Sequence, residues 1–248
     1  MVDLLFGDLT TLDILLAVAT GFTATVVVVI AFFMSERGAP KWKPRKIVHT
    51  SLGTVIALTI MSYSNLSGPA LAAGIFLTVL MYAWAHKPDL ISELLLAGSR
   101  EGDERLSTFA AGFMGLLSFS LVFILFNPRP EILVAAILTV SWADGAGEVF
   151  GRPYGGKVIK KRFRKKSAEG TIAVFIFAAL SVAVALLVYS VDTSPLTVLP
   201  QILIIAAAIA FVEIFSIAWT DNFFLPFVTA VLMWQLLFPT MTLIGAFS

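Results

Sequence analysis

Two acidic residues, Asp144 and Glu148, interrupt an apolar segment of the chain. Because residues four positions apart share a face of a helix, their carboxylates would lie on the same side of a helix here. A carboxylate is costly in the hydrocarbon region of a membrane, so acids within membrane-spanning helices commonly have a function. We therefore interpret Asp144 as a metal ligand or a general base. The alternative is that it pairs with a buried Arg or Lys and only fixes the packing.

A cluster of five glycines follows Asp144 along the chain: Gly145, Gly147, Gly151, Gly155 and Gly156. Their spacing matches neither the phosphate-binding loop GxxxxGK[ST] nor the dinucleotide-binding pattern. For Gly145 and Gly147, two roles are equally compatible with the sequence: they allow membrane helices to pack closely, or they allow a ligand to approach the backbone. The last three are predicted to lie outside the membrane span, beside Arg152 and Lys157, and there we expect a phosphate-binding backbone.

A run of mostly basic residues, Lys157–Lys166, leads from the glycines to the next apolar segment. Most of it, from Lys160 to Lys165, is expected to fix the topology or to lie on anionic lipid headgroups. Lys166 and Ser167 stand at the predicted start of the next helix, where free backbone amides and the helix dipole favour an anion. These two residues are therefore better candidates for contacts with the phosphates of a nucleotide.

Three further groups of polar residues lie in or beside apolar segments. Arg45 and His49 are about one helical turn apart, although a lone histidine is often only a hydrogen-bonded packing residue. Glu213 lies inside an apolar segment and is by default a functional candidate. Asp221 and Asn222 favour turns, but two oxygen ligands there would also suit Mg²⁺. Because the chain has no cysteine and only 2 histidines, any metal would bind to oxygen atoms.

The composition indicates which elements hold these residues. Of the 248 residues, 58% are hydrophobic and 13% are charged, whereas about a quarter of a soluble domain is charged. We predict an all-α integral membrane protein, a single polytopic domain over residues 1–248, because the apolar runs are long and lack the alternation of β-strands. With about 20 apolar residues to a span, we count about eight spans: Leu12–Met34, Ile47–Tyr63, Gly68–Ala85, Phe109–Phe126, Ile132–Phe150, Thr171–Val191, Leu196–Trp219 and Phe223–Phe247.

The basic residues are distributed unevenly over the connections between these segments. All but one of the 17 Lys and Arg residues fall in the first, third and fifth connections. Because positive charges stay on the cytoplasmic side of a membrane, we predict that these connections are cytoplasmic and that both termini lie outside. The candidate residues then gather at the cytoplasmic face, whereas a transporter more often has them near the midplane. We interpret the first apolar segment as a retained span, and the absence of a targeting segment favours a prokaryotic cell membrane.

Taken in order, the polar residues resemble the motifs of the polyprenol kinase family, which includes dolichol kinases, phytol kinases and their archaeal and bacterial relatives. The early RKxxH pattern is matched by Arg45, Lys46 and His49, with Gly53 following. The central pattern of an acid, small residues, GR, a further glycine and KSxEGTxA is matched by Asp144, Gly151, Arg152, Gly155 and Lys166–Ala173. The late pattern is matched by Glu213, Asp221, Asn222 and Pro226.

These matches span most of the chain and keep the order of the family. One departure lies at the central acid, where the family commonly reads GDxxA. Here Ala143 precedes Asp144, and Gly147 takes the place of the later small residue. This departure leaves the identity of the substrate open within the family.

The resemblance implies a CTP-dependent kinase that phosphorylates the terminal hydroxyl of a long-chain isoprenoid alcohol of the dolichol, geranylgeraniol or phytol type. It implies Mg²⁺ as cofactor, and as partners the alcohol, a nucleotide triphosphate and the lipid bilayer, but no nucleic acid. The implied catalytic residues are Asp144, Asp221, Arg45 and His49. The implied nucleotide-binding residues are Gly151, Arg152, Gly155, Lys157, Lys166, Ser167, Glu169 and Gly170. The implied metal ligands are Asp144, Asp221, Asn222 and Glu213.

The sequence leaves several alternatives open. Either Asp144 or Asp221 would accept the proton of the substrate hydroxyl. A cytidylyltransferase that makes a CDP-activated lipid would use the same CTP, Mg²⁺ and membrane face, but it would release pyrophosphate. A transporter or scramblase would need polar groups that continue to the far face, and the outer connections are short and almost uncharged. The oligomeric state is also open, with a homodimer as one option.

Overall fold

The computed structural model describes residues 6–40, 42–85, 105–126, 128–154, 158–160, 166–216, 220–241 and 243. Apart from one three-residue 3₁₀ helix, these residues form eight helices and one two-stranded sheet. In this count, the consecutive helical pieces of residues 130–154 are taken as one continuous helix. Four helices are long and apolar enough to cross a membrane: Thr11–Glu36, Phe109–Phe126, Pro130–Arg152 and Ala168–Tyr189. The prediction of a helical membrane protein is confirmed to this extent, and each of the eight predicted segments contains a helix.

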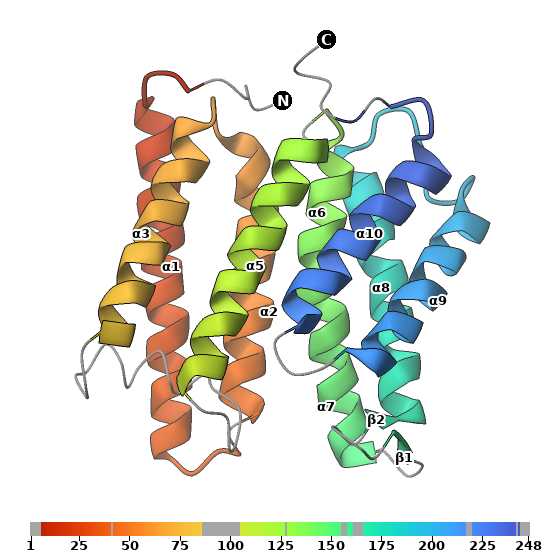
Figure 1. The fold of residues 1–248 in the computed structure, drawn as a ribbon, viewed down its shortest axis with the longest axis horizontal. Helices are drawn as coiled ribbons and strands as arrows, with labels where there is room; N and C mark the ends of the chain where they lie inside the picture. The colour runs from red at the N-terminus through yellow and green to blue at the C-terminus, as the bar shows by residue number, and fades with distance from the viewer. Residues whose placement is uncertain are drawn as a thin grey trace. The chain divides into compact units, whose positions relative to one another are not determined.

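Contacts between residues divide the chain into two compact units, Met1–Leu116 and Leu117–Ser248, called unit 1 and unit 2 here. Unit 1 contains the elements α1 (Thr11–Glu36), α2 (Trp42–Thr59), the short 3₁₀ helix η1 (Ile60–Ser62) and α3 (Ser67–Ala85). Helix α5 (Arg105–Phe126) begins in unit 1 and ends in unit 2. Within unit 1, α1 packs against both α2 and α3 (Figure 1).

Helix α1 begins and ends at residues suited to those positions. The Oγ1 atom of Thr10 accepts a hydrogen bond from the amide of Asp13 at 3.1 Å, and the Asp13 carboxylate accepts one from the amide of Thr10 at 2.9 Å. This reciprocal pair is a capping box. The other carboxylate oxygen of Asp13 accepts a hydrogen bond from the amide of Ser64 at 2.8 Å. Gly38, with a φ of 77°, follows the last turn, as is common after helix ends.

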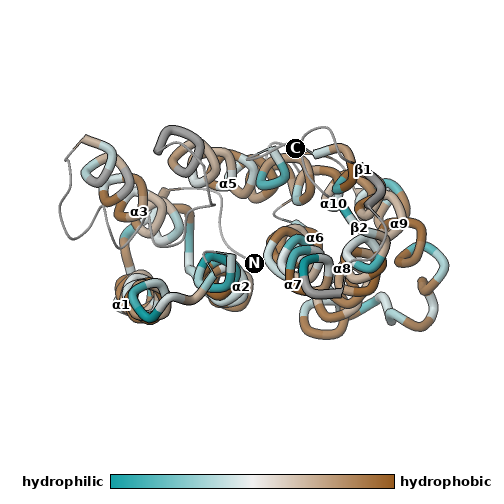
Figure 2. The backbone as a smooth tube through the Cα atoms, turned by 90° about the horizontal axis from the view of Figure 1, so that it is seen from below, coloured by the Kyte–Doolittle hydropathy of each residue, from teal (hydrophilic) through white to brown (hydrophobic). Residues whose placement is uncertain are grey.

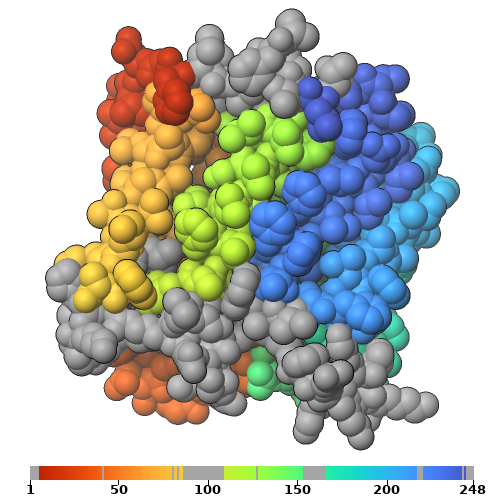
Figure 3. All heavy atoms as spheres, in the orientation of Figure 1, coloured from red at the N-terminus to blue at the C-terminus, as the bar shows by residue number. Residues whose placement is uncertain are grey.

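Unit 2 is built around the helix that contains Asp144. Its elements are α6 (Pro130–Leu138), the π-helix η2 (Thr139–Ala143), α7 (Asp144–Tyr154), β1 (Val158–Lys160), β2 (Lys166–Ser167), α8 (Ala168–Tyr189), α9 (Leu199–Phe215) and α10 (Asp221–Leu237). Every residue of α6 after Pro130 is buried, and α6 packs against α8 and α10. Helix α8 also packs against α7 and α9, and the side chains of α10 lie beside those of α9 (Figure 3). Hydrophobic residues predominate along α6, α8, α9 and α10, whereas α7 is more hydrophilic (Figure 2).

The helices of unit 2 alternate in direction, so that their ends form two groups (Figure 1). At one end α7 ends, α8 begins, α9 ends and α10 begins. We call this the site end, and its polar residues include Lys166, Ser167, Glu213 and Asp221. At the other end α6 begins, α8 ends and α9 begins. We call this the clamp end, and its polar residues include Arg129, Glu131 and Asp192.

Several helices begin or end at other residues than the approximate membrane spans that were predicted. Helix α2 begins at Trp42, before the predicted Ile47, because Pro44 is tolerated in a first helical turn. Helix α10 ends at Leu237, before the predicted Phe247. Helix α7 continues to Tyr154, past the predicted end at Phe150, because a helix can extend beyond the apolar run that marks a span. The short antiparallel β1–β2 hairpin was not predicted.

Candidate functional site

Ser167 lies at the amino-terminus of α8, as the sequence predicted. Ser167 is the residue that caps α8, and its Oγ accepts a hydrogen bond from the amide of Gly170 at 3.2 Å. The same Oγ lies 3.3 Å from the carbonyl oxygen of Gly151, to which it donates. The cap therefore joins the start of α8 to the last turns of α7.

Three glycines let α7 and α8 approach each other at the level of the backbone. A Cβ atom on Gly170 would lie 2.7 Å from the carbonyl oxygen of Gly147 and 3.2 Å from the Cα of Gly151. A Cβ atom on Gly147 would lie 2.7 Å from a methyl group of Val174. Such close approach is the usual function of small residues between membrane helices. The geometry thus supports the packing explanation for Gly147, and it gives Gly151, which lies in α7 and not in a loop, the same role.

Lys166 and Glu213 form an ion pair at the site end, between the ammonium Nζ and the carboxylate Oε1. Their side chains are only 11% and 6% exposed. The pair joins β2, directly before α8, to the last turn of α9. Gly147 borders it, since a Cβ atom there would lie 3.8 Å from Glu213 Oε1. Glu213, which the family resemblance implied as a metal ligand, is bound to a cation of the protein itself.

The two candidate catalytic acids of unit 2 are both buried. Asp144 is 5% exposed and Asp221 is fully buried. Asp144 is the first residue of α7 and directly follows η2, and Asp221 begins α10. One Asp221 oxygen accepts a hydrogen bond from the amide of Asn222 at 3.1 Å. Asp144 thus lies inside the continuous helix Pro130–Arg152, whereas Asp221 lies at the start of α10.

The π-helix before Asp144 is a feature that the sequence analysis missed. Single turns of π-helix are frequent at functional sites, because the wider turn shifts the side chains that follow it. Within η2, Thr139 is fully buried, and its Oγ1 has no hydrogen-bond partner among the described residues. Its neighbour Ser141 donates to the carbonyl oxygen of Ile137 at 2.8 Å. No composition signal distinguishes this turn from an ordinary α-helical turn.

Arg152 also has an acidic partner. Its Nη2 lies 2.8 Å from Oε1 of Glu148, one turn earlier in α7, and its side chain is 47% exposed. The two acids that share a face in the sequence, Asp144 and Glu148, therefore differ in surroundings. Glu169, in the first turn of α8, has one carboxylate oxygen that is buried and has no hydrogen-bond partner in the described part of the chain.

The remaining predicted residues lie elsewhere. Arg45 and His49 are partly buried on α2, in unit 1, and Lys46 beside them is only 4% exposed. Gly155 and Lys157 lie outside the residues that the structure describes. Within the described residues, no group of three or more His, Asp or Glu side chains could hold a metal ion.

The clamp end holds a charged cluster that the sequence analysis did not identify. Arg129 Nη1 lies 3.3 Å from Glu131, and both Arg129 terminal nitrogens lie 3.1 Å from Asp192. The guanidinium also stacks over the Phe238 ring, 4.5 Å from its centre. Hydrogen bonds from Arg129 and then from Ser190 lower the pKa of Asp192 from its ordinary value. The signal was present in the sequence, since Arg129 is the one basic residue outside the three basic connections.

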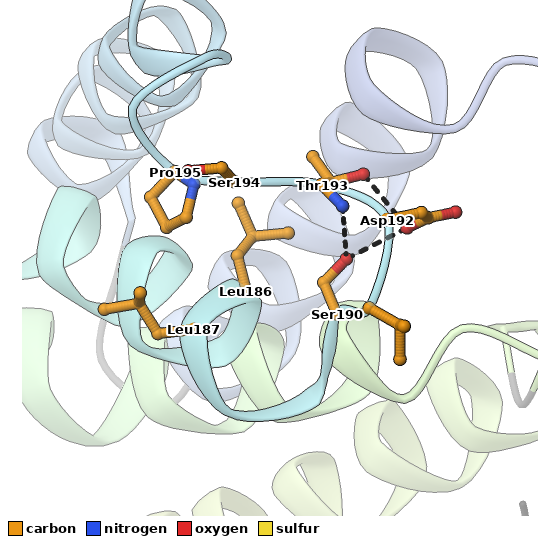
Figure 4. Close-up of a pocket in the computed structure, with 8 residues that line it drawn as sticks. Leu186, Leu187, Ser190, Asp192, Thr193, Ser194 and Pro195 are labelled. Atoms are coloured by element: carbon orange, nitrogen blue, oxygen red, sulfur yellow. Dashed lines mark hydrogen bonds between the residues drawn. The ribbon is translucent and has the colours of Figure 1, made fainter.

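A shallow cavity of about 310 Å³ lies beside this cluster (Figure 4). Its lining includes Leu186, Ser190, Asp192, Thr193 and Pro195. The polar side chains in it are bonded to one another. Ser190 Oγ donates to Asp192 at 3.1 Å and accepts from the amide of Thr193 at 3.2 Å (Figure 4). The hydrogen bonds in this hollow are therefore those of a structured loop.

A comparison of the chain with protein-family models, curated proteins and solved structures finds no match. The resemblance to polyprenol kinases therefore rests on the residue motifs. The function that this resemblance implies is a proposal, which the arrangement of unit 2 can support by the residues that it brings together.

Proposed function

We propose that this protein is a CTP-dependent kinase that transfers a phosphoryl group to the terminal hydroxyl of a long-chain isoprenoid alcohol at the cytoplasmic face of a membrane. The observation that carries the proposal is the convergence of the motif segments within unit 2. Gly151 of the central motif contacts Ser167, and Lys166 of the same motif binds Glu213 of the late motif. Segments far apart in the sequence thus meet at the site end, which is what a shared active site requires.

The membrane arrangement follows from the helices and from the basic connections. Besides the four long helices, α2, α3, α9 and α10 have 18, 19, 17 and 17 residues, within the range of about 17–25 that crosses a bilayer. We infer eight spans, with both termini outside and the site end on the cytoplasmic side. A prokaryotic cell membrane is the proposed location.

The cations at the site end suit a chain of phosphates. Phosphoryl transfer requires mainly positioning and neutralisation of charge, with little covalent chemistry from the protein. Lys166 lies beside the amino-terminus of α8, whose free amides and dipole favour anions. Arg152 is held near the end of α7 and is about half exposed, so that it can also reach a ligand. CTP, as the particular nucleotide, comes from the family resemblance alone.

The acids of unit 2 fit a magnesium ion that arrives with the nucleotide. Mg²⁺ in kinases commonly takes one or two carboxylates and completes its shell with phosphate oxygens and water, so a cluster of three acids is not required. Asp144 and Asp221 would hold it, with the Asn222 amide oxygen as a further donor. The ion would neutralise charge on the phosphates. Glu213 fits this role less well, because Lys166 already compensates its charge.

One buried acid would act as the general base. Asp144 and Asp221 are the two carboxylates with little exposure that the motif residues supply for this role. One of these two acids would also orient the hydroxyl of the alcohol and accept its proton. The cap at Ser167 and the glycine contacts keep α7 and α8 in register, so that these groups are held in place.

An apolar groove between α8 and α9 is suited to the chain of the alcohol. It has a volume of about 350 Å³, and its lining includes Ile172, Phe175, Ala210 and Phe211. Its polar edge is Thr171, whose hydroxyl donates to the carbonyl oxygen of Ser167 at 3.1 Å. The groove therefore begins one turn from the residue that caps α8, which lets the hydroxyl of an amphiphile approach the site end.

Three buried hydroxyl groups of unit 2 count against a transport pathway through them. Ser181 and Thr229 are fully buried, and each donates to the backbone carbonyl four residues earlier, at 2.8 and 2.7 Å. Ser141 does the same. Hydroxyls that are satisfied within their own helix do not form a polar path through a bundle.

The experiment that tests the proposal uses the purified protein in nanodiscs with Mg²⁺ and CTP labelled at the γ-phosphate. Geranylgeraniol, phytol and a dolichol are supplied in parallel, and Asp144→Asn is the matched variant. We expect label in an organic-extractable lipid monophosphate, with a rate at least about 100-fold lower in the variant. Release of labelled pyrophosphate in the presence of phosphatidic acid would instead indicate a cytidylyltransferase. No turnover of CTP with any lipid would refute both enzymatic functions.

A further inference from the structure

The ammonium of Lys166 occupies an unusual position for a cation. It directly precedes Ser167, the cap of α8, and so lies at the positive end of the dipole of that helix. Cations are normally favoured at the opposite end of a helix. Its side chain is also only 11% exposed, and a buried cation is stable only when an anion accompanies it. In this structure the anion is the carboxylate of Glu213.

Glu213 reaches this position from another helix. It lies in the last turn of α9, and the Ser216 hydroxyl donates to its backbone carbonyl at 2.9 Å, which ends the helix there. Its carboxylate thus occupies the place beside Lys166 and the start of α8 that an anionic ligand would take. A carboxylate and a phosphate carry the same sign of charge and accept from the same donors.

We propose that Glu213 is the resident counter-ion of Lys166, which neutralises this ammonium in the ligand-free protein and competes with the phosphates of a nucleotide for it. This inference rests on the proposed function, in which Lys166 contacts those phosphates. It gives Glu213 a positioning role in place of the metal-binding role that the resemblance implied. The ion pair keeps the buried ammonium of Lys166 stable between catalytic cycles, and it lowers the affinity of the site for phosphate.

The clearest test measures the binding of inorganic tripolyphosphate to the full-length protein in detergent, by calorimetry, with EDTA and then with Mg²⁺. Glu213→Gln removes the competing charge and keeps the shape of the side chain. We expect Kd to fall about tenfold in EDTA, which corresponds to about 1.4 kcal/mol. The double variant Lys166→Met/Glu213→Gln should not show this increase in affinity, because it lacks the ammonium that would bind the phosphates.

Glu131→Gln is the matched control, because Glu131 is also a buried glutamate paired with a basic residue, at the clamp end. It should lower the thermal stability and leave the Kd for tripolyphosphate within about twofold of the wild type. If Glu213→Gln does not fold, Glu213→Asp provides a second measurement. Its shorter side chain should weaken the contact with Lys166 and lower Kd about threefold.

The possible results separate this inference from the proposed function. An unchanged or higher Kd for Glu213→Gln in EDTA would overturn the counter-ion role. A loss of affinity of Glu213→Gln that appears only with Mg²⁺ would also overturn it, because Glu213 would then be a metal ligand. In both cases lipid phosphorylation by the wild type would leave the kinase proposal intact. If the wild type binds no tripolyphosphate under either condition, the phosphate site and the kinase proposal fail together.

Discussion

Glu131 and Glu213 are both buried glutamates of unit 2 with a basic partner, but the partners are held differently. Arg129 lies two residues from Glu131 and also binds Asp192 at 3.1 Å and stacks on the Phe238 ring. Its planar guanidinium has a fork of donors that two carboxylates can share. Lys166 comes from a segment 47 residues away from Glu213, and its ammonium is a compact charge on a flexible stem.

The difference shows how one bundle can use the same chemistry for two purposes. At the clamp end, one guanidinium connects the start of α6, the α8–α9 connection and the residue after α10. At the site end, the ion pair lies beside the start of a helix, where an anion is favoured. We therefore regard the first as a structural clamp and the second as a pair whose anion can be replaced.

The largest effect should come from removing the clamp. Arg129→Met leaves the carboxylate of Glu131, which is 2% exposed, without its cation. Removing one partner of a buried pair costs about 3 kcal/mol or more. We expect the thermal unfolding midpoint in detergent to fall clearly, while the Kd for tripolyphosphate stays that of the wild type.

Arg129→Lys sharpens this test, because it keeps the positive charge and removes the forked set of guanidinium N–H donors. It should recover part of the lost stability, with a deficit of about 1 kcal/mol, since a lysine cannot serve both carboxylates and the Phe238 ring in the same geometry. A wild-type midpoint for Arg129→Met would show that the cluster does not fix the clamp end. A large change in phosphate affinity would show that the two ends are not independent.

The order and type of the helices could be predicted from the sequence, because a bilayer demands long apolar helices whatever their contacts. The ends were less predictable. Helix α7 continues past Phe150 because its last turns, although polar, pack on the start of α8 through Gly151. That contact is tertiary, and no local pattern contains it. The π-helix η2 and the short β1–β2 hairpin were not predicted either.

Within the candidate site, the sequence could predict where Ser167 lies in its helix, but it could not predict which residues become partners. Ser167 was placed at the start of α8 from its residue type and its position before an apolar run, and the structure confirms this. The pairing of Lys166 with Glu213 joins residues that the sequence separates widely. The glycines were ambiguous between ligand approach and packing, and only the distances at Gly147 and Gly170 favour packing.

A smaller effect is expected from filling the glycine contact at the site end. In Gly170→Ala, the new methyl group would lie 2.7 Å from the carbonyl oxygen of Gly147, which belongs to the backbone and cannot rotate away. Overpacking of this kind costs about 2 kcal/mol, and separation of α7 from α8 should also reduce kinase activity.

Gly74→Ala in α3 is the control, because a Cβ atom there meets no atom within 4 Å. It should leave the unfolding midpoint unchanged or raise it slightly, since alanine favours a helix over glycine by about 1 kcal/mol. Equal stability of the two variants would mean that α7 and α8 can separate without cost. The glycine contact between α7 and α8 would then not be what holds the site end rigid.

The smallest effect should appear in the acid sensitivity of the clamp end. Hydrogen bonds from Arg129 and Ser190 lower the pKa of Asp192 below its ordinary value of 3.8. Because this pKa is lower in the folded protein than in the unfolded chain, the ionised form contributes stability at pH values above about 3.8, and this contribution is lost as the pH falls through the lowered value.

The measurement compares the thermal unfolding midpoints at pH 5.5 and pH 3, which lie about one or two units from the ordinary pKa. Between these two pH values, the midpoint of the wild type should drop more than that of Asp192→Asn. In the Arg129→Met background the same substitution should make a smaller difference, because only the hydrogen bonds from Ser190 and Thr193 then lower the pKa of Asp192. Parallel curves for the wild type and Asp192→Asn would show that Asp192 is only a surface neighbour of the clamp, which would then consist of Arg129 and Glu131 alone.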